Sequence, residues 1–420
     1  MMKRFKPKSE FSRNVLTLMT GTTIAQAIPI AISPILTRIY TPADFGVFAL
    51  FIAIVGMFGT IASGRYEMAI MLPKKDENAI NIVALGLIIT VFISLALLVF
   101  ILIFDNYLTM LLNNKEIGFW LYFVPISVFF VGFFNVLSYF NNRKKYYKDI
   151  ANATMLKSIV LAIIQLLIGF LKPGATGLIS GQIISNAFAN MKLLKNISKD
   201  KKLLSNISKP KMMVLAEKYK DFPKFQAPHA FSNNLSSNMP IYLFSSFFNS
   251  MIVGFYSLSI RIVFAPLMII AGASAKVYNQ HISDIRNQKG DSYGFTVRVL
   301  KSLLKKIIIP FLIIVIFAPS IFAFIFGEEW REAGVYTQIL SPWLLMVFMV
   351  ATVSYIPSLY LKQKQAFMLE VVYVISRLIV LSIGVYLNDI YVALSLFSFI
   401  SFLSLSYTMY WYSKLLTRNK

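Results

Sequence analysis

The 420-residue sequence contains no cysteine and only two histidines, His229 and His281. The absence of cysteine excludes disulfides, thiol chemistry and cysteine-based metal sites. Charged residues are scarce too, at 14% of the chain against roughly a quarter in soluble domains. Because 57% of the residues are hydrophobic, the composition excludes an ordinary water-soluble protein.

Acidic residues are the scarcer charged type, with 18 Asp and Glu against 41 Lys and Arg and a net charge of +23. In a soluble chain this excess would indicate nucleic acid binding. In an apolar chain, basic residues instead indicate which loops lie on the inner side of a membrane. Their distribution along the chain decides between these two interpretations.

Twelve stretches are long and apolar enough to cross a membrane, since a hydrocarbon core of about 30 Å needs about 20 apolar residues in a helix. One such stretch could be a buried helix of a soluble protein, but twelve could not. We therefore predict an all-α integral membrane protein with transmembrane helices at 14–37, 45–64, 79–104, 117–141, 151–171, 173–191, 225–248, 249–275, 307–326, 333–358, 366–387 and 390–413.

The basic residues are distributed unequally between alternate loops. If the N-terminus is cytoplasmic, 34 of the 41 lie in inner segments and three lie within spans, which leaves four in outer loops. This asymmetry predicts a multi-pass protein with both termini cytoplasmic. Because the basic residues follow sidedness rather than one surface, we expect no nucleic acid partner, and we expect the inner loops to contact anionic lipids.

The segment 192–224, which contains ten lysines, divides the predicted spans into two blocks of six. We predict an N-terminal lobe at 1–191, a basic cytoplasmic linker at 192–224 and a C-terminal lobe at 225–420. A signal peptide cleaved after Ala25-Gln26-Ala27 is the alternative for the first stretch. We favour a span, because the apolar run continues to Leu36.

The two blocks begin alike. In each, a proline lies 18 residues after a phenylalanine, at Pro29 and Pro240, and a Gly-x-x-x-Leu pattern follows, at 46–50 and 254–258. The repeats fall at the first two spans of each block in the same order. This arrangement is typical of transporters built from parallel repeats.

The first and seventh spans are interrupted by proline and are unusually polar. Polar groups within a membrane must form hydrogen bonds with other protein groups or with water. Interrupted spans at corresponding positions of two repeats indicate a substrate pathway. The alternative is hydrogen bonding between packed helices. We favour a cavity for the seventh span, and we expect cavity-lining side chains at Thr22, Gln26, His229, Asn233, Asn234 and Asn238.

Three basic residues lie within predicted spans. Arg261 and Arg377 fall near the middle of the membrane, where a charge is costly and snorkelling does not easily reach water. Lys157 is shallower, so that binding a substrate and snorkelling to the inner interface both remain open. Glu370 lies two helical turns before Arg377. It could serve as a counter-ion of Arg377 or as a coupling carboxylate, or it could pair locally with Lys362 or Lys364. Three cations with only one carboxylate predict an anionic substrate. An arginine guanidinium can donate two parallel hydrogen bonds to the oxygens of a phosphate.

Two motifs in the first block, at 36–46 (LTRIYTPADFG) and 64–73 (GRYEMAIMLP), resemble the opening of bacterial polysaccharide-export proteins. These are the Wzx-type flippases of O-antigen and capsule repeat units, in the multidrug, oligosaccharidyl-lipid and polysaccharide exporter superfamily. The second block continues the likeness at 221–223 (DFP), 254–256 (GFY) and Arg261. The resemblance covers essentially the whole chain.

The resemblance implies a two-lobed, V-shaped transporter of the bacterial cytoplasmic membrane that works by alternating access. Its substrate would be an undecaprenyl-pyrophosphate-linked oligosaccharide, whose pyrophosphate crosses a cationic cavity at Arg261, Arg377 and Lys157. Within the two motifs we expect gate or mouth residues at Arg38, Asp44, Arg65 and Glu67. No bound cofactor is expected, coupling to H⁺ or Na⁺ stays open, and the polymerase of the same pathway is an expected partner.

Two other functions are alternatives to a flippase. A membrane enzyme of the same pathway, such as a polymerase or ligase, would need catalytic groups on a large outer loop, and the sequence has neither such a loop nor paired carboxylates. A cation-coupled drug antiporter would need carboxylates in its cavity, whereas the charges within the spans are mostly basic. We therefore predict a transporter of an anionic lipid-linked substrate and no catalytic or metal-binding residues.

Overall fold

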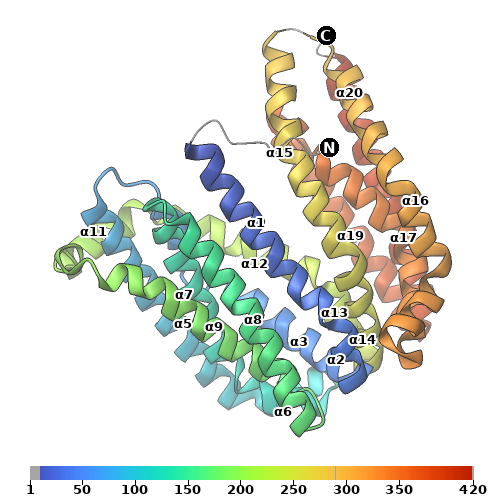
Figure 1. Ribbon diagram of the computed structural model, residues 1–420, viewed down its shortest axis with the longest axis horizontal. Helices are drawn as coiled ribbons and strands as arrows, with labels where there is room; N and C mark the ends of the chain where they lie inside the picture. The colour runs from blue at the N-terminus through green and yellow to red at the C-terminus, as the bar shows by residue number, and fades with distance from the viewer. Residues whose placement is uncertain (1–9, 289, 419–420) are drawn as a thin grey trace. The chain divides into compact units, whose positions relative to one another are not determined.

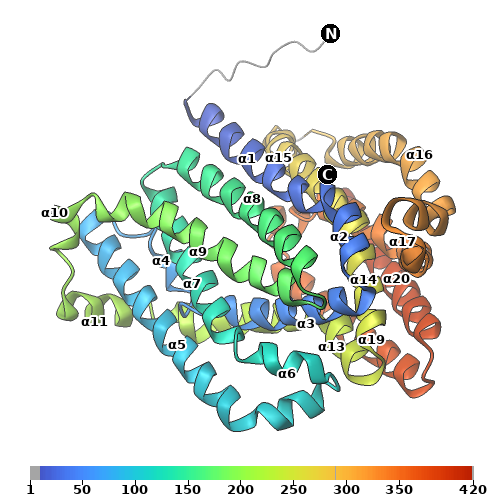
Figure 2. The same cartoon turned by 60° about the horizontal axis from the view of Figure 1, so that its bottom comes forward.

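The computed structural model describes residues 10–288 and 290–418, and every regular element in these two ranges is a helix (Figures 1 and 2). Contacts between residues group the chain into two units, Met1–Tyr242 and Leu243–Lys420. The helices up to the boundary are α1 (Glu10–Ala31), α2 (Ser33–Ile39), α3 (Pro42–Gly59), α4 (Tyr66–Ala69), α5 (Asp76–Leu111), α6 (Lys115–Leu121), α7 (Val124–Arg143), α8 (Tyr147–Leu171), α9 (Thr176–Ser198), α10 (Lys201–Leu204), α11 (Lys209–Lys218), η1 (Phe222–Gln226) and α12 (Ala227–Ser237).

The boundary lies inside α13 (Met239–Phe247). After it come α14 (Ser250–Ser259), η2 (Ile260–Phe264), α15 (Ala265–Asn287), α16 (Ser292–Phe326), η3 (Glu328–Trp330), α17 (Arg331–Thr352), α18 (Ile356–Leu359), α19 (Gln363–Tyr386) and α20 (Ile390–Arg418). Elements η1 and η2 are π-helices, and η3 is a 3₁₀ turn.

Ten helical runs of the described chain have the length and apolar composition to cross a membrane. They correspond to all the predicted spans except the sixth and the seventh. The sixth is the continuous helix α9, which is too polar to qualify because it carries Ser180, Gln182, Ser185, Asn186 and Asn190. The seventh is broken at Asn238 between α12 and α13. For these two helices, membrane crossing stays a prediction.

Three of the other predicted spans are also broken, and one of them is the tenth, which divides into α17 and α18 after Thr352. The first divides at Ile32 into α1 and α2, because Pro34 favours a new helix start and its nitrogen cannot continue the hydrogen-bond ladder. The Ser33 hydroxyl donates to the Pro29 carbonyl at 2.7 Å and so satisfies a group at the break. The fourth divides in the same way into α6 and α7, with Pro125 in the first turn of α7.

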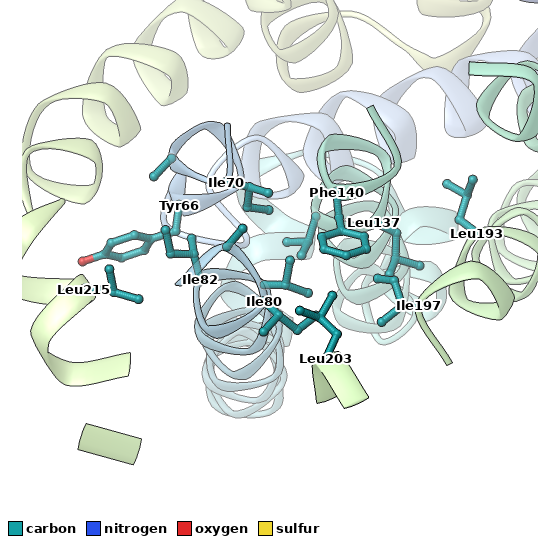
Figure 3. Close-up of a cluster of buried hydrophobic side chains, with 14 of the residues drawn as sticks. Tyr66, Ile70, Ile80, Ile82, Leu137, Phe140, Leu193, Ile197, Leu203 and Leu215 are labelled. Atoms are coloured by element: carbon teal, nitrogen blue, oxygen red, sulfur yellow. The ribbon is translucent and has the colours of Figure 1, made fainter. Parts of the chain in front are cut away.

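Segments predicted to lie on the inner side meet at one end of the first unit. A hydrophobic cluster joins the turn around α4 and the start of α5 to the ends of α7 and α9 and to α10 and α11 (Figure 3). Leu203 of α10 and Leu215 of α11 are both buried in this cluster. Figure 2 shows α10 and α11 beside the first part of α5, in agreement with their contacts. The segment 192–224, predicted as a linker, is therefore helical and packed onto the first unit.

A second cluster in the same unit collects the segments predicted to be outside. It joins α3, the far part of α5, α6, the start of α7 and the start of α9. In the second unit, an equivalent cluster at the predicted inner end joins α15, α18 and the end of α20. In the first unit, the segments predicted to lie inside and those predicted to lie outside thus gather in separate clusters, and in the second unit segments predicted to lie inside gather in one cluster.

Candidate functional site

Polar side chains are exposed on two helices of the first unit that correspond to the predicted pathway. On α1, the exposed residues include Thr20, Thr23 and Gln26. On α12, the exposed residues are mainly polar, namely His229, Ser232, Asn233 and Ser237, and the exposed exceptions are Pro228 and Leu235. Of the predicted lining residues, Gln26, His229 and Asn233 are thus exposed, and Thr22 is half-buried.

The other face of α12 attaches this helix to α3. Asn234 is half-buried, and its amide nitrogen donates a hydrogen bond to the Thr60 hydroxyl oxygen at 3.4 Å. Phe231 packs edge-on against Phe58 with ring centroids 6.1 Å apart. Asn238 donates to the side-chain and backbone oxygens of Asn234, both at 3.0 Å, and so holds the break before α13. Both alternatives for the seventh span therefore have counterparts: Asn234 and Asn238 bond internally, while His229 and Asn233 are exposed.

Lys157 lies on α8 and is half-buried. Its ammonium group lies 5.7 Å from the centroid of the Phe134 ring on α7, within the range of a cation–π interaction. No ion pair within the described ranges includes Lys157. The charge is therefore accommodated by an aromatic ring and not by a carboxylate.

Arg261 lies on the π-helix η2, within the longest candidate span of the second unit, Ser250–Asn287. Its side chain is half-buried. A π-helix is rare because it is less favourable than an α-helix, and single π turns occur frequently at functional sites. The local backbone therefore distinguishes Arg261 from an ordinary helical residue, which periodicity in the sequence did not reveal.

Arg377 is buried, with 9% of its surface exposed. Its guanidinium lies between two rings, 5.0 Å from the centroid of Tyr373 and 4.6 Å from that of Phe397. Tyr373 is on α19 with Arg377, and Phe397 is on α20. Tyr373 is four residues before Arg377, so that their proximity could be read from the sequence. Phe397 is 20 residues away and is brought near only by the packing of α19 on α20.

Glu370 is exposed on α19. None of the ion pairs found between described residues joins it to Arg377 or to Lys362 and Lys364. Neither the predicted counter-ion contact nor the predicted local pair is thus formed as a direct contact in this conformation. Its use as a coupling carboxylate stays a prediction.

The first sequence motif forms a tightly bonded connection between α2 and α3. Asp44 is buried and accepts hydrogen bonds from the backbone nitrogen and the hydroxyl of Thr41, both at 2.8 Å, while Thr41 caps α3 in return. Tyr40 donates to the Gln165 carbonyl at 2.6 Å, and burial, with a smaller contribution from Asp44, raises the pKa of Tyr40 to about 12. Arg38 is exposed. Asp44 therefore has a capping role, whereas Arg38 is available at the surface.

The second motif forms a strained turn. Gly64 and Arg65 are both in the left-handed region, with φ of 60° and 62°, which a side chain at position 65 adopts only at some cost. Glu67 is 1% exposed, pairs with the Arg65 guanidinium at 3.2 Å and accepts a hydrogen bond from the Ser63 hydroxyl. Tyr66 donates to the Ala216 carbonyl of α11 at 3.0 Å. The motif thus links the turn to α11, a contact that the sequence analysis missed.

No group of three or more His, Cys, Asp or Glu side chains in the described chain could hold a metal ion. The structure also shows exposed polar residues on α15 that the sequence analysis did not select, namely Lys276 and Gln280. Their spacing of four residues was the available signal, because it places both on one face of a helix. They were assigned to a loop only because the apolar stretch ends before them.

The sequence profile of a family described as polysaccharide biosynthesis protein matches residues 35–335. A comparison with curated protein sequences finds no match.

Several solved structures have the same fold. The lipid II flippase MurJ in an inward closed conformation is 14% identical with a TM-score of 0.70, over 94% of this chain and 87% of that one. An inward-facing multidrug resistance transporter of the MATE family, in the MOP superfamily, is 14% identical with a TM-score of 0.60, over 97% and 95%. A MOP superfamily transporter from Pyrococcus furiosus, described as having a binding pocket of reversed polarity, is 13% identical with a TM-score of 0.53, over 97% and 96%. The predicted all-α membrane transporter fold is confirmed.

Proposed function

Because the chain belongs to the polysaccharide biosynthesis protein family, we propose that it is a flippase for undecaprenyl-pyrophosphate-linked oligosaccharides. It would move these repeat units of a surface polysaccharide from the inner to the outer leaflet of the bacterial cytoplasmic membrane. The proposal rests on the family, on the fold shared with a lipid II flippase, and on the side chains exposed at membrane depth.

The observation that carries the proposal is the exposed polar face of α12. Hydroxyl, amide and imidazole groups exposed to lipid would lose their hydrogen bonds to water, at a cost of several kcal/mol each. The same groups exposed to a water-filled passage suit the hydroxyl-rich surface of an oligosaccharide. His229 and Asn233 are therefore proposed to contact the sugar, together with Gln26 of α1.

The pyrophosphate is proposed to bind the cations within the spans. Arg261 is the main candidate, since it is half-buried on a π turn, and a guanidinium binds phosphate oxygens through two parallel hydrogen bonds. Lys157 contributes a second charge from the first unit. Arg377 lies against the rings of Tyr373 and Phe397 in this conformation. We therefore propose that it adds to the positive potential of the second unit without direct contact with the phosphate.

A drug antiporter remains the second candidate, because the fold is shared with a multidrug resistance transporter. Binding a cationic drug would require carboxylates on the exposed polar faces, and the described side chains of those faces, from Thr20 onward on α1 and along α12, carry hydroxyl, amide and imidazole groups instead. This chemistry favours a sugar-bearing, anionic substrate.

The test is restoration of surface polysaccharide in a strain that lacks its own flippase. We expect Arg261→Ala to abolish surface polysaccharide at unchanged abundance in the membrane, and Arg261→Lys to restore it only in part, because lysine keeps the charge without the paired geometry. Chemical analysis of the glycan, together with the accumulation of lipid-linked repeat units inside the cell, gives the measurement.

Lys115→Ala is the matched control, because it removes a cation that is exposed outside the candidate spans. It should leave the surface polysaccharide unchanged. Wild-type levels of surface glycan in the Arg261→Ala variant would remove Arg261 from the mechanism. Resistance to cationic drugs without any effect on glycan would instead support the antiporter.

A further inference from the structure

A groove lies between α15 and α16 in the second unit, where the two helices run side by side (Figure 1). It has a volume of about 540 Å³ and is lined by Ala273, Ser274, Val277, Tyr278, Phe295, Arg298, Val299, Ser302 and Leu303. The lining combines small and apolar side chains with two hydroxyls and one guanidinium. The proposed flippase mechanism does not use any of these residues.

The positive charge of the groove is not neutralised by a direct partner. No ion pair between described residues includes Arg298, which is exposed. The nearest acid along α16 is Asp291, whose carboxylate accepts a hydrogen bond from the Gly294 nitrogen at 3.1 Å and so caps the helix. Lys306 is four residues after Ser302, on the same helix face, and is exposed as well. One cation, Arg298, thus lines the groove, and a second, Lys306, lies one helical turn beyond it on the same face.

The floor of the groove is fixed by stacked rings. Tyr278 and Phe295 are stacked, with centroids 5.9 Å apart, and His281 stacks on the same Phe295 at 6.2 Å. The Tyr278 hydroxyl is hydrogen-bonded to that of Thr296 at 2.8 Å. A groove with such a floor keeps its shape without a ligand, which lowers the cost of binding.

The exposed face of α16 changes character along the helix. Up to Lys306 its exposed residues include Arg298, Lys301, Ser302 and Lys305, and from Ile309 onward they are almost all apolar. The exposed apolar residues that follow are Ile309, Leu312, Ile313, Ile316 and Phe317. A change from basic to apolar within three residues on one face marks the boundary between lipid headgroups and hydrocarbon. The groove therefore lies at the depth of the headgroups, on the basic side of that boundary.

We propose that the groove between α15 and α16 binds the phosphate of a resident anionic phospholipid. The Arg298 guanidinium donates two hydrogen bonds to the phosphate, Lys306 adds charge, and the Ser274 and Ser302 hydroxyls donate to the remaining oxygens or to the glycerol. The acyl chains then follow the apolar face that begins at Ile309. Basic pockets between transmembrane helices on the cytoplasmic side are suited to such headgroups.

The test is native mass spectrometry of the full-length protein in detergent, with phosphatidylglycerol and phosphatidylcholine of identical acyl chains as probes. The wild-type protein should retain one phosphatidylglycerol in preference to phosphatidylcholine. In the double variant Arg298→Gln with Lys306→Gln, we expect the affinity for phosphatidylglycerol to fall on the order of tenfold and the affinity for phosphatidylcholine to fall less, because its choline offsets the phosphate charge. Arg298 and Lys306 are both exposed, so that the double variant should fold normally.

Lys301→Gln is the matched control. It removes the same charge from the same helix at an exposed position that is outside the row formed by residues 298, 302 and 306, and it should keep the wild-type preference. Equal binding of phosphatidylglycerol by the double variant and the wild type would overturn the proposal.

Two competitors distinguish other sources of a phosphate. Inorganic phosphate at millimolar concentration and equimolar undecaprenyl pyrophosphate should each leave the phosphatidylglycerol bound. Displacement by inorganic phosphate would show a site for free anions, and displacement by undecaprenyl pyrophosphate would show a site for the transported lipid. Either result would contradict a resident phospholipid. Because the measurement involves no transport, it does not depend on the proposed flippase function.

Discussion

Helices α5 and α12 both leave side chains uncovered by the rest of the first unit, and those side chains have opposite chemistry. Between residues 88 and 104 of α5, every exposed residue is apolar, and Phe92 is 70% exposed. On α12 the exposed residues are mainly polar, with His229 and Asn233 among them. The apolar surface of α5 suits lipid, whereas the polar surface of α12 would need water if this helix lies in the membrane as predicted.

The largest expected effect comes from placing a charge on each surface. Phe92→Asp should lower the abundance of the protein in the membrane severalfold, because an aspartate at the centre of a span costs about 2.5–3.5 kcal/mol on insertion scales. Asn233→Asp places the same side chain on α12 and should leave abundance close to that of the wild type. Quantitative immunoblotting of membrane fractions measures both. Equal loss in the two variants would show that α12 faces lipid as α5 does.

A smaller effect, without any added charge, is expected from single cysteines, for which this cysteine-free chain is a suitable background. Asn233→Cys should react with a water-soluble maleimide in purified protein reconstituted into vesicles, and Phe92→Cys should react on the order of tenfold more slowly, because the thiolate forms only where water reaches it. Mass spectrometry of the labelled protein gives the rates. A faster reaction at position 92 would reverse the assignment of the two surfaces.

The smallest effect distinguishes the two faces of α12 itself. Asn233 and Asn234 are adjacent, but Asn234 bonds to Thr60 and accepts from Asn238, whereas Asn233 is exposed. Asn234→Ala should reduce stability by about 1 kcal/mol, as is usual for a lost hydrogen bond, and Asn233→Ala should change it little. Thermal unfolding in detergent, followed by a fluorescent thiol-independent dye, is the measurement. If Asn233→Ala were the more destabilising, the exposed face would be a packing face.

The sequence predicted the helices well where a single physical cause decides them. Charge-free stretches must be helical in a membrane, because every backbone group has to be bonded within the segment. The interruption of the first and seventh spans by proline was predicted, and both spans are broken, at Ile32 and Asn238. The two π-helices, and the position of the first break beside Pro34 instead of at Pro29, were not predicted. The positions of the lobe boundaries depend on packing: α12 contacts α3, so that the contacts group residues 225–242 with the first unit.

The candidate site was predictable by residue type but not by environment. A cation in an apolar stretch is visible in the sequence, and Arg261, Lys157 and Arg377 were found in this way. Of the rings near these cations, Phe397 beside Arg377 and Phe134 beside Lys157 belong to other helices and could not be assigned. Asp44 and Glu67 are charged residues in motifs, which suggested a gate, yet both are buried and bonded to neighbours in their own turns. A motif can thus reflect the demands of a turn as well as those of transport.

The π turn that carries Arg261 also sets the direction in which the following helix presents its side chains. A π turn contains one residue more than an α turn, and each residue advances an α-helix by about 100° around its axis. All of α15 is therefore rotated by about that angle from the bearing it would have as an unbroken continuation of α14. Loss of one residue within 260–264 would turn the π turn into an α turn and leave the bearing of Lys276 and Gln280 unchanged, whereas regularising the turn without losing a residue would re-aim both.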